Sequence, residues 1–308
     1  MSSLPTAPLR VASIPFAAQT GEIEQNAARV VAWIERAARE RIGLAVFPEA
    51  CLTGGIGGRA STPARTMRRA QIRALAASID GAHVRAVADA VERTGVAAGV
   101  GLIERAQSGE LYSSYAVCVP GDGRHVHRRL HTDGQPHLAG GDRFTVFDMQ
   151  QGWRLAVLVG SDNYRGESAR MAALLGAGLL LAPHAQPDAA GATGATDDPG
   201  AWMGRTLPAR ALDKGLFVVY SDRGEGAIVD PCGRIVAQRA GGDEAIPAEL
   251  DPALLGSSPG QRWLETRRSD LYARLAYGSR EGVPSFEPRN AGARGAVAVS
   301  FAVVRRNG

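Results

Sequence analysis

Strand-like and helix-like segments alternate through the first third of the chain, and this order restricts its possible folds more than any other feature. Leu9–Phe16 alternates between apolar and polar residues, as a strand with one buried face does. Glu22–Arg41 carries apolar residues at helical spacing, and Leu44–Phe47 is a short apolar strand-like run. A second helix is predicted over His83–Arg93 and another strand over Val96–Ile103. This alternation predicts a sheet covered by helices.

Strands that follow one another closely dominate the later part of the chain. The turn signal Gly121-Asp122-Gly123 separates two of them. The predicted strands are Tyr115–Pro120, Arg124–Arg128, Phe144–Asp148, Arg154–Val159, Gly178–Ala182, Leu216–Tyr220, Gly226–Val229 and Arg234–Gln238, and the predicted helices are Glu167–Leu175 and Trp202–Lys214. Hairpin-like pairs after an alternating start favour a layered α/β sandwich over a dinucleotide-binding sheet. Neither GxGxxG after the first strand nor GxxxxGK[ST] occurs, which argues against a phosphate-binding loop.

Charge and cysteine content argue against several other classes. The net charge is +4, Lys214 is the single lysine, and no basic run is interleaved with aromatic residues. We therefore expect a solvated, arginine-rich surface and no nucleic-acid partner. The three cysteines are widely spaced, which predicts neither a disulfide framework nor a metal site, and no cofactor is expected. Met1–Leu9 has no signal-peptide pattern and no apolar run is long enough to span a bilayer, so we expect a cytoplasmic protein without membrane contact.

Two segments fall outside this pattern of strands and helices. Ala185–Gly200 is poor in large apolar residues and is predicted to be a long loop. Beyond Leu275 the chain is rich in Gly, Pro and Arg before one apolar stretch, Ala296–Val304. We therefore expect one domain over residues 1–275 and a C-terminal tail over residues 276–308 that packs on a neighbouring chain or continues a sheet.

Short motifs occur in a fixed order along the chain. The first is Leu44-Ala45-Val46-Phe47-Pro48-Glu49, followed by Leu52-Thr53-Gly54. The later ones are His127-Arg128-Arg129-Leu130-His131, Gly141-Asp142, Val159-Gly160-Ser161-Asp162 with Glu167 and Arg170, Ala209-Arg210-Ala211-Leu212-Asp213, Ile228-Val229-Asp230-Pro231 and Glu265–Tyr272. As an ordered set, from about residue 8 to residue 275, they resemble the nitrilase (carbon–nitrogen hydrolase) superfamily. The resemblance implies a four-layer αββα sandwich, often dimeric, that acts on a small molecule.

The resemblance also assigns roles to single residues. In this family a cysteine thiolate attacks the substrate, one glutamate transfers protons, a lysine stabilises the oxyanion and a second glutamate assists. Glu49 matches the first glutamate, and Arg129 takes the place of the lysine with its positive charge retained. The second glutamate falls on His137, with Asp133 and Gln135 as alternatives if the loop contains a gap.

Gly160 stands where the family has its cysteine. We expect Glu49 and Gly160 to lie at the ends of adjacent strands and to face one pocket, with Gly160, Ser161 and Asp162 contacting the ligand. Ser161 should face away from Glu49, because neighbouring side chains on an extended segment point in opposite directions. Cys51 lies close enough to Glu49 to share its face, but a buried structural thiol is the better interpretation. Structural roles are also expected for Cys118, in a strand, and Cys232, in a turn.

Two classes of function remain compatible with the sequence. In the first, the pocket binds a small amide, amine or acid, and Glu49, Arg129 and His137 perform acid–base chemistry without a covalent intermediate. In the second, the chain is an inactive relative that serves as a binding or assembly module. Since one fold supports many functions, the residues of the site decide between them.

Overall fold

The computed structural model describes residues 4–56, 68–132, 135–185, 199–242 and 244–272. By internal contacts the chain divides into two units, Met1–Thr266 and Arg267–Gly308. The predicted tail over residues 276–308 and most of the predicted loop over Ala185–Gly200 lie outside the described residues.

The first unit contains two six-stranded sheets. In the first sheet the strand order is β12-β1-β2-β3-β4-β5, and in the second it is β11-β10-β9-β8-β7-β6. The first consists of β1 (Leu9–Ser13), β2 (Leu44–Val46), β3 (Ala97–Arg105), β4 (Leu111–Val119), β5 (Gly123–Arg128) and β12 (Ile246–Leu250). The second consists of β6 (Thr145–Asp148), β7 (Arg154–Val157), β8 (Leu179–Pro183), β9 (Phe217–Ser221), β10 (Glu225–Val229) and β11 (Ile235–Ala240).

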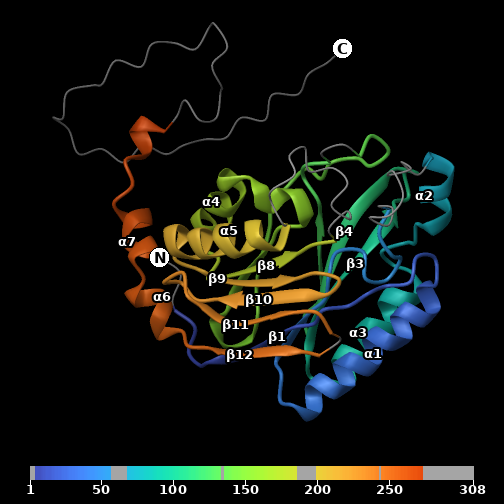
Figure 1. The fold of residues 1–308 in the computed structure, drawn as a ribbon, viewed down its shortest axis with the longest axis horizontal. Coiled ribbons are helices and arrows are strands. Elements are labelled where there is room, and N and C mark those ends of the chain that lie inside the picture. The colour runs from blue at the N-terminus through green and yellow to red at the C-terminus, as the bar shows by residue number, and fades with distance from the viewer. Residues whose placement is uncertain (1–3, 57–67, 133–134, 186–198, 243, 273–308) are drawn as a thin grey trace, which may run out of the picture. The chain divides into compact units, whose positions relative to one another are not determined.

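Helices cover the outer faces of both sheets (Figure 1). Against the first sheet pack α1 (Ile23–Arg39) and α3 (Ala82–Thr94), and against the second pack α4 (Gly166–Leu174) and α5 (Pro199–Lys214). The shorter elements are α2 (Arg69–Leu75), α6 (Ala253–Ser257), α7 (Pro259–Glu265) and the 3₁₀ turns η1 (Gln150–Gly152), η2 (Gly160–Tyr164) and η3 (Ser269–Leu271), the last of which lies in the second unit. The predicted four-layer αββα sandwich is confirmed.

Side-chain alternation explains how the layers hold together. In β2, Leu44 and Val46 join the apolar core between the two sheets, whereas Ala45 and the following Phe47 face α1 and α3. A strand that is buried on both faces reads as a continuous apolar run, which is what Leu44–Phe47 shows. The site described below begins directly after this run.

The predicted elements omit α2, α6, α7 and β12 and begin β4 too late, and for β12 and β4 the reason can be identified. β12 contains Pro247, which cannot donate to a sheet ladder, but β12 is an edge strand, where proline is tolerated. β4 begins at Leu111 rather than at Tyr115, because Ser113 and Ser114 are buried polar residues that resemble a loop in the sequence. Both serine hydroxyls have glutamate partners, Glu49 and Glu104 respectively.

The described part of the second unit is short. In it the Arg268 guanidinium lies 2.6 Å from a carboxylate oxygen of Asp270, and the Arg267 guanidinium lies 5.0 Å from the centre of the Tyr272 ring.

Candidate active site

Glu49 is fixed by its backbone as the chain leaves β2. The hydroxyl of Tyr115 lies 2.7 Å from the carbonyl oxygen of Phe47 and 2.8 Å from that of Gly99, which holds the end of the strand in place. The backbone N–H of Glu49 donates to the carbonyl oxygen of His184 at 3.0 Å. Ala50 follows with a φ of 55°, in the left-handed region that side chains other than glycine rarely adopt. Strained positions of this kind often occur at functional sites.

The carboxylate of Glu49 is anchored through one oxygen. Its Oε1 accepts hydrogen bonds from Ser113 Oγ at 2.5 Å and from Arg129 Nη1 at 3.0 Å. Its Oε2 accepts no hydrogen bond from any residue that the structure describes. Glu49 is 8% exposed and Arg129 is 5% exposed, so this ion pair is almost completely removed from solvent.

Arg129 has further contacts that limit its movement. Its Nη2 donates to Oε1 of Gln135, while its buried Nε has no hydrogen-bond partner. Among the candidates for the second-glutamate position that the structure describes, Gln135 is therefore the one whose side chain contacts Arg129. His137 makes no hydrogen bond to another described residue, and Asp133 lies outside the described residues.

Gly160 approaches this ion pair from the second sheet, as the first residue of η2. Its φ is 51°. A Cβ atom added to it would lie 2.6 Å from Glu49 Oε2 and 3.5 Å from Arg129 Nη1. Glu49 and Gly160 thus lie next to each other. The expectation that they end adjacent strands is wrong, because Glu49 follows β2 of one sheet and Gly160 follows β7 of the other. The Glu49 carboxylate occupies the space that a side chain at residue 160 would need.

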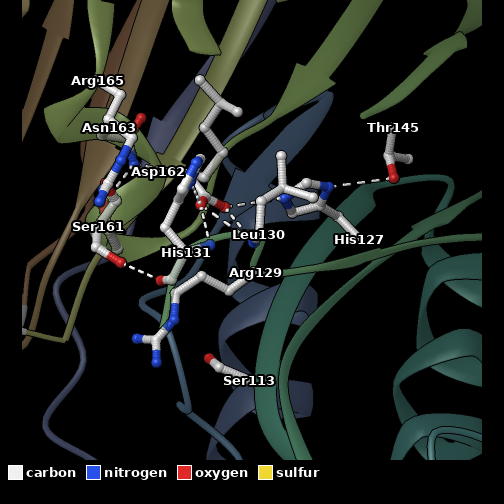
Figure 2. A network of polar contacts seen from close by, with 12 residues as sticks. Ser113, His127, Arg129, Leu130, His131, Thr145, Ser161, Asp162, Asn163 and Arg165 are labelled. Carbon is white, nitrogen blue, oxygen red and sulfur yellow. Dashed lines mark hydrogen bonds and ion pairs between the residues drawn. The ribbon is translucent and has the colours of Figure 1, made fainter. Parts of the chain in front are cut away.

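Asp162 holds the segment that carries Arg129 (Figure 2). Its fully buried carboxylate accepts hydrogen bonds from the backbone N–H groups of Leu130 and His131 at 2.9–3.1 Å. It also accepts from the rings of His127, at 3.2 Å, and His131, at 2.8 Å. Burial alone would raise the pKa of Asp162, but these hydrogen bonds outweigh it and the pKa falls below its ordinary value. Asp162 therefore positions Arg129 indirectly, by holding the backbone of the next two residues, Leu130 and His131.

We expect Asp162→Asn to lower the free energy of unfolding at neutral pH by about 1.5–3 kcal/mol, the typical worth of a hydrogen bond to a charged group. The stability that ionised Asp162 contributes is present above the unfolded pKa of about 3.9 and is lost as pH falls through the lower folded pKa. Wild type should therefore lose more stability than the variant below about pH 4 in urea unfolding. Asp148→Asn, which removes an exposed carboxylate, is the control, and an identical pH dependence for Asp162→Asn and wild type would contradict the prediction.

Ser161 and the cysteines lie apart from the ion pair. The Ser161 hydroxyl donates to the carbonyl oxygen of His131 (Figure 2). Cys51 contacts the backbone of Gly101 within the core next to α1 and α3, and burial raises the pKa of its thiol to about 12. Burial likewise raises the pKa of Cys118 to about 11, and Cys232 is half-buried in the turn after β10. Thiols with raised pKa values are poor nucleophiles.

Two residues of the site, Ser113 and His184, were not predicted from the sequence. Ser113 contacts Glu49 from a strand far along the chain, and only knowledge of the β3–β4 pairing could have found it. His184 directly follows β8, and its carbonyl oxygen accepts the hydrogen bond from Glu49. A histidine immediately after a buried strand is the signal that could have indicated it.

The chain belongs to the carbon–nitrogen hydrolase family, whose family model matches residues 10–259. It is 30% identical over 253 residues to the "Hydrolase in pqqF 5'region" of Pseudomonas protegens, covering 76% of this chain and 80% of that protein. It is also 27% identical over 278 residues to an aliphatic nitrilase of Sinorhizobium fredii, covering 79% and 86% of the two chains.

Solved structures share the fold. Nit3 of Saccharomyces cerevisiae, a member of branch 10 of the nitrilase superfamily, superposes with a TM-score of 0.71 at 22% identity, over 87% of this chain and 98% of that one. An amidase of Nesterenkonia superposes with a TM-score of 0.67 at 18% identity, over 88% and 98% of the two chains. In that structure the acetamide moiety of fluoroacetamide is added covalently at the active-site cysteine.

The described residues contain no helix that is long and apolar enough to cross a membrane. Within the same residues no group of three or more His, Cys, Asp and Glu side chains is placed to hold a metal ion. The chemistry available at the meeting point of the two sheets is that of a carboxylate with one free oxygen, a guanidinium that neutralises it, and a neighbouring histidine.

Proposed function

We propose that this carbon–nitrogen hydrolase-family protein binds a small amide, amine or acid and acts on it by acid–base chemistry, without a covalent thiol intermediate. The observation that carries the proposal is the state of Glu49. Its Oε1 is held by Ser113 and Arg129, whereas its Oε2 is free of hydrogen bonds from the described residues and faces Gly160. An anchored carboxylate with one free oxygen is suited to take a proton from a substrate or from an attacking water.

Arg129 and Asp162 support this chemistry in different ways. Arg129 cannot lose its proton, so it can stabilise negative charge but cannot act as an acid. Its Nε, buried and without a partner, is the donor left over after Nη1 and Nη2 are engaged. Asp162 is saturated with hydrogen bonds and holds the Arg129 segment rather than the ligand.

The absence of a thiol nucleophile is part of the proposal. By the order of the motifs, Gly160 stands where relatives carry their cysteine, and the match is supported because a Cβ at this position would reach Glu49 and Arg129. The raised pKa values of Cys51 and Cys118 argue against either as a replacement. Since His137 has no hydrogen-bonded partner among the described residues, its proposed catalytic role rests on the sequence alone.

A binding module is the second candidate, and one observation favours it. The Glu49 carboxylate fills the position that a side chain at Gly160 would take, and it is neutralised by a buried arginine. Such a site can hold a ligand without turning it over.

Assembly is proposed on the family resemblance, and location on the sequence pattern. We propose a cytoplasmic homodimer. The apolar side chains of Met171, Leu174 and Leu175 on or next to α4 are 37–42% exposed, and this surface is one on which a second copy could pack.

Glu49→Gln separates the two candidates. We expect wild type to release ammonia from at least one member of a panel of small amides, and Glu49→Gln to do so about 10²–10⁴-fold more slowly, the usual contribution of a general base. Ammonia release measures activity, and circular dichroism shows whether the variant is folded. Glu35→Gln, an exposed glutamate on α1, is the matched control. Equal turnover by wild type and Glu49→Gln would contradict the acid–base proposal, whereas ligand binding without turnover by wild type would favour the binding module.

A further inference from the structure

His184 is fixed beside Glu49 by its own backbone. Its N–H donates to the carbonyl oxygen of Ser221 at 2.8 Å, and its carbonyl oxygen accepts from the N–H of Glu49 at 3.0 Å. The residue is 2% exposed. Any movement of its main chain would therefore disturb the position of Glu49.

The imidazole of His184 lacks the hydrogen bonds that such burial normally requires. Its Nε2 is completely buried and has no hydrogen-bond partner in the described part of the chain. More than about 90% of buried polar groups in proteins have a partner, so an exception of this kind calls for an explanation. An unpartnered polar atom opposes folding, and a bound ligand that pairs with it would remove that cost.

The surroundings of the ring determine what it can offer. Its centre lies 5.8 Å from that of Tyr164, on η2, and 5.3 Å from that of Tyr220, on β9. Burial lowers the pKa of His184 to about 3, with Arg129 adding to the effect and Asp162 opposing it. The ring is therefore neutral near pH 7, with one N–H donor and one acceptor nitrogen.

We infer that His184 is a ligand-contacting residue of the Glu49 site, and that it donates or accepts a hydrogen bond with an uncharged polar group of the bound molecule. The inference rests on the proposed function of Glu49. An uncharged group fits because Glu49 is balanced by Arg129 and the Asp162 carboxylate is saturated with hydrogen bonds. A charged ligand would enter a buried site without an unpaired counter-charge among these residues.

The probe for the test is acetamide, with acetate as its charged counterpart. Binding is followed by NMR on protein with isotope-labelled histidine, and the His184 ring signals are assigned by their absence in His184→Phe. We expect acetamide, but not acetate, to shift these signals. We expect His184→Phe to bind acetamide about three- to tenfold more weakly, as the loss of one neutral hydrogen bond predicts. Its melting temperature should equal or exceed that of wild type, because a buried, unpartnered nitrogen atom is removed.

Further variants distinguish the possible failures. His184→Gln keeps a donor and an acceptor and should retain part of the affinity, and it serves if His184→Phe does not fold. His83→Phe, on α3, is the control for labelling and assignment. If His184→Phe binds acetamide as wild type does while Glu49→Gln does not, the role of His184 is overturned and the proposed function stands. If neither variant changes acetamide binding, the role of His184 is overturned, and ammonia release by Glu49→Gln decides the proposed function separately. If wild type does not bind acetamide, the inferred class of ligand is overturned. Ammonia release by wild type and Glu49→Gln still tests the proposed function.

Discussion

Arg129→Met should lower the free energy of unfolding by about 3–5 kcal/mol, the usual result of removing one partner from a buried ion pair. The substitution keeps much of the side-chain volume but leaves the Glu49 carboxylate, at 8% exposure, without its cation. Ser113 would remain as its one hydrogen-bond donor among the described residues. Urea unfolding at neutral pH measures the loss, and activity is not needed for the test.

A double-mutant cycle identifies the cause of that loss. Adding Glu49→Gln to Arg129→Met removes the stranded charge, so the double variant should be more stable than Arg129→Met alone. Arg36→Met is the control, because Arg36 pairs with Glu40 at the surface, where such pairs contribute about 0–1 kcal/mol. A loss of the same size for Arg129→Met and Arg36→Met would show that the Glu49–Arg129 pair is not buried in solution.

The layers of the fold could be predicted because local patterns and global burial agree. Ile34 and Val30 recur at helical spacing and are both fully buried under the first sheet. Element ends were harder to predict, since they depend on partners distant in sequence. The start of β4 is stabilised by Glu49, in the turn after β2, and by Glu104 of β3, and β12 is a strand because it pairs with β1.

The site was predictable to the extent that motifs mark it. Glu49, Arg129 and Gly160 come from three motifs, and the fold brings all three within contact distance. Sequence spacing could not choose between Gln135 and His137, because the choice depends on which side chain the loop turns toward Arg129. The contact of His184 with Glu49 is made by a backbone carbonyl, so only the position of His184 directly after a buried strand could have indicated it.

The contacts of Asp162 in the structure are with the protein itself. Its position in a conspicuous motif suggested a ligand-binding residue, but its carboxylate is fully occupied by the 127–131 segment. A buried carboxylate that already accepts several hydrogen bonds has little capacity left for a ligand. The motif therefore preserves the geometry of Arg129.

Gly160→Cys should not restore strong amidase activity, and it should lower stability. The residue has a φ of 51°, where a side chain costs about 1–2 kcal/mol. Its Cβ would also lie 2.6 Å from Glu49 Oε2, so the carboxylate must move away from Arg129 and Ser113 to admit it. The new thiol would therefore displace the Glu49 carboxylate, which it needs for proton transfer. It would also lie beside an arginine rather than a lysine. Ammonia release from acetamide and urea unfolding measure the two effects.

Gly95 provides the matched control for strain without collision. It has a φ of 73° and nothing within 4 Å of an added Cβ, so Gly95→Ala carries the backbone cost alone. Gly160→Ala should cost more than Gly95→Ala, and the difference measures the displacement of Glu49. In wild type, fluoroacetamide should leave Cys51, Cys118, Cys232 and Ser161 unmodified by mass spectrometry, because none of these four side chains forms a hydrogen bond to Glu49 or Arg129. A fluoroacetamide adduct at one of these residues, or strong amide hydrolysis by Gly160→Cys, would show that the Glu49–Arg129 pair does not block the position of the nucleophile.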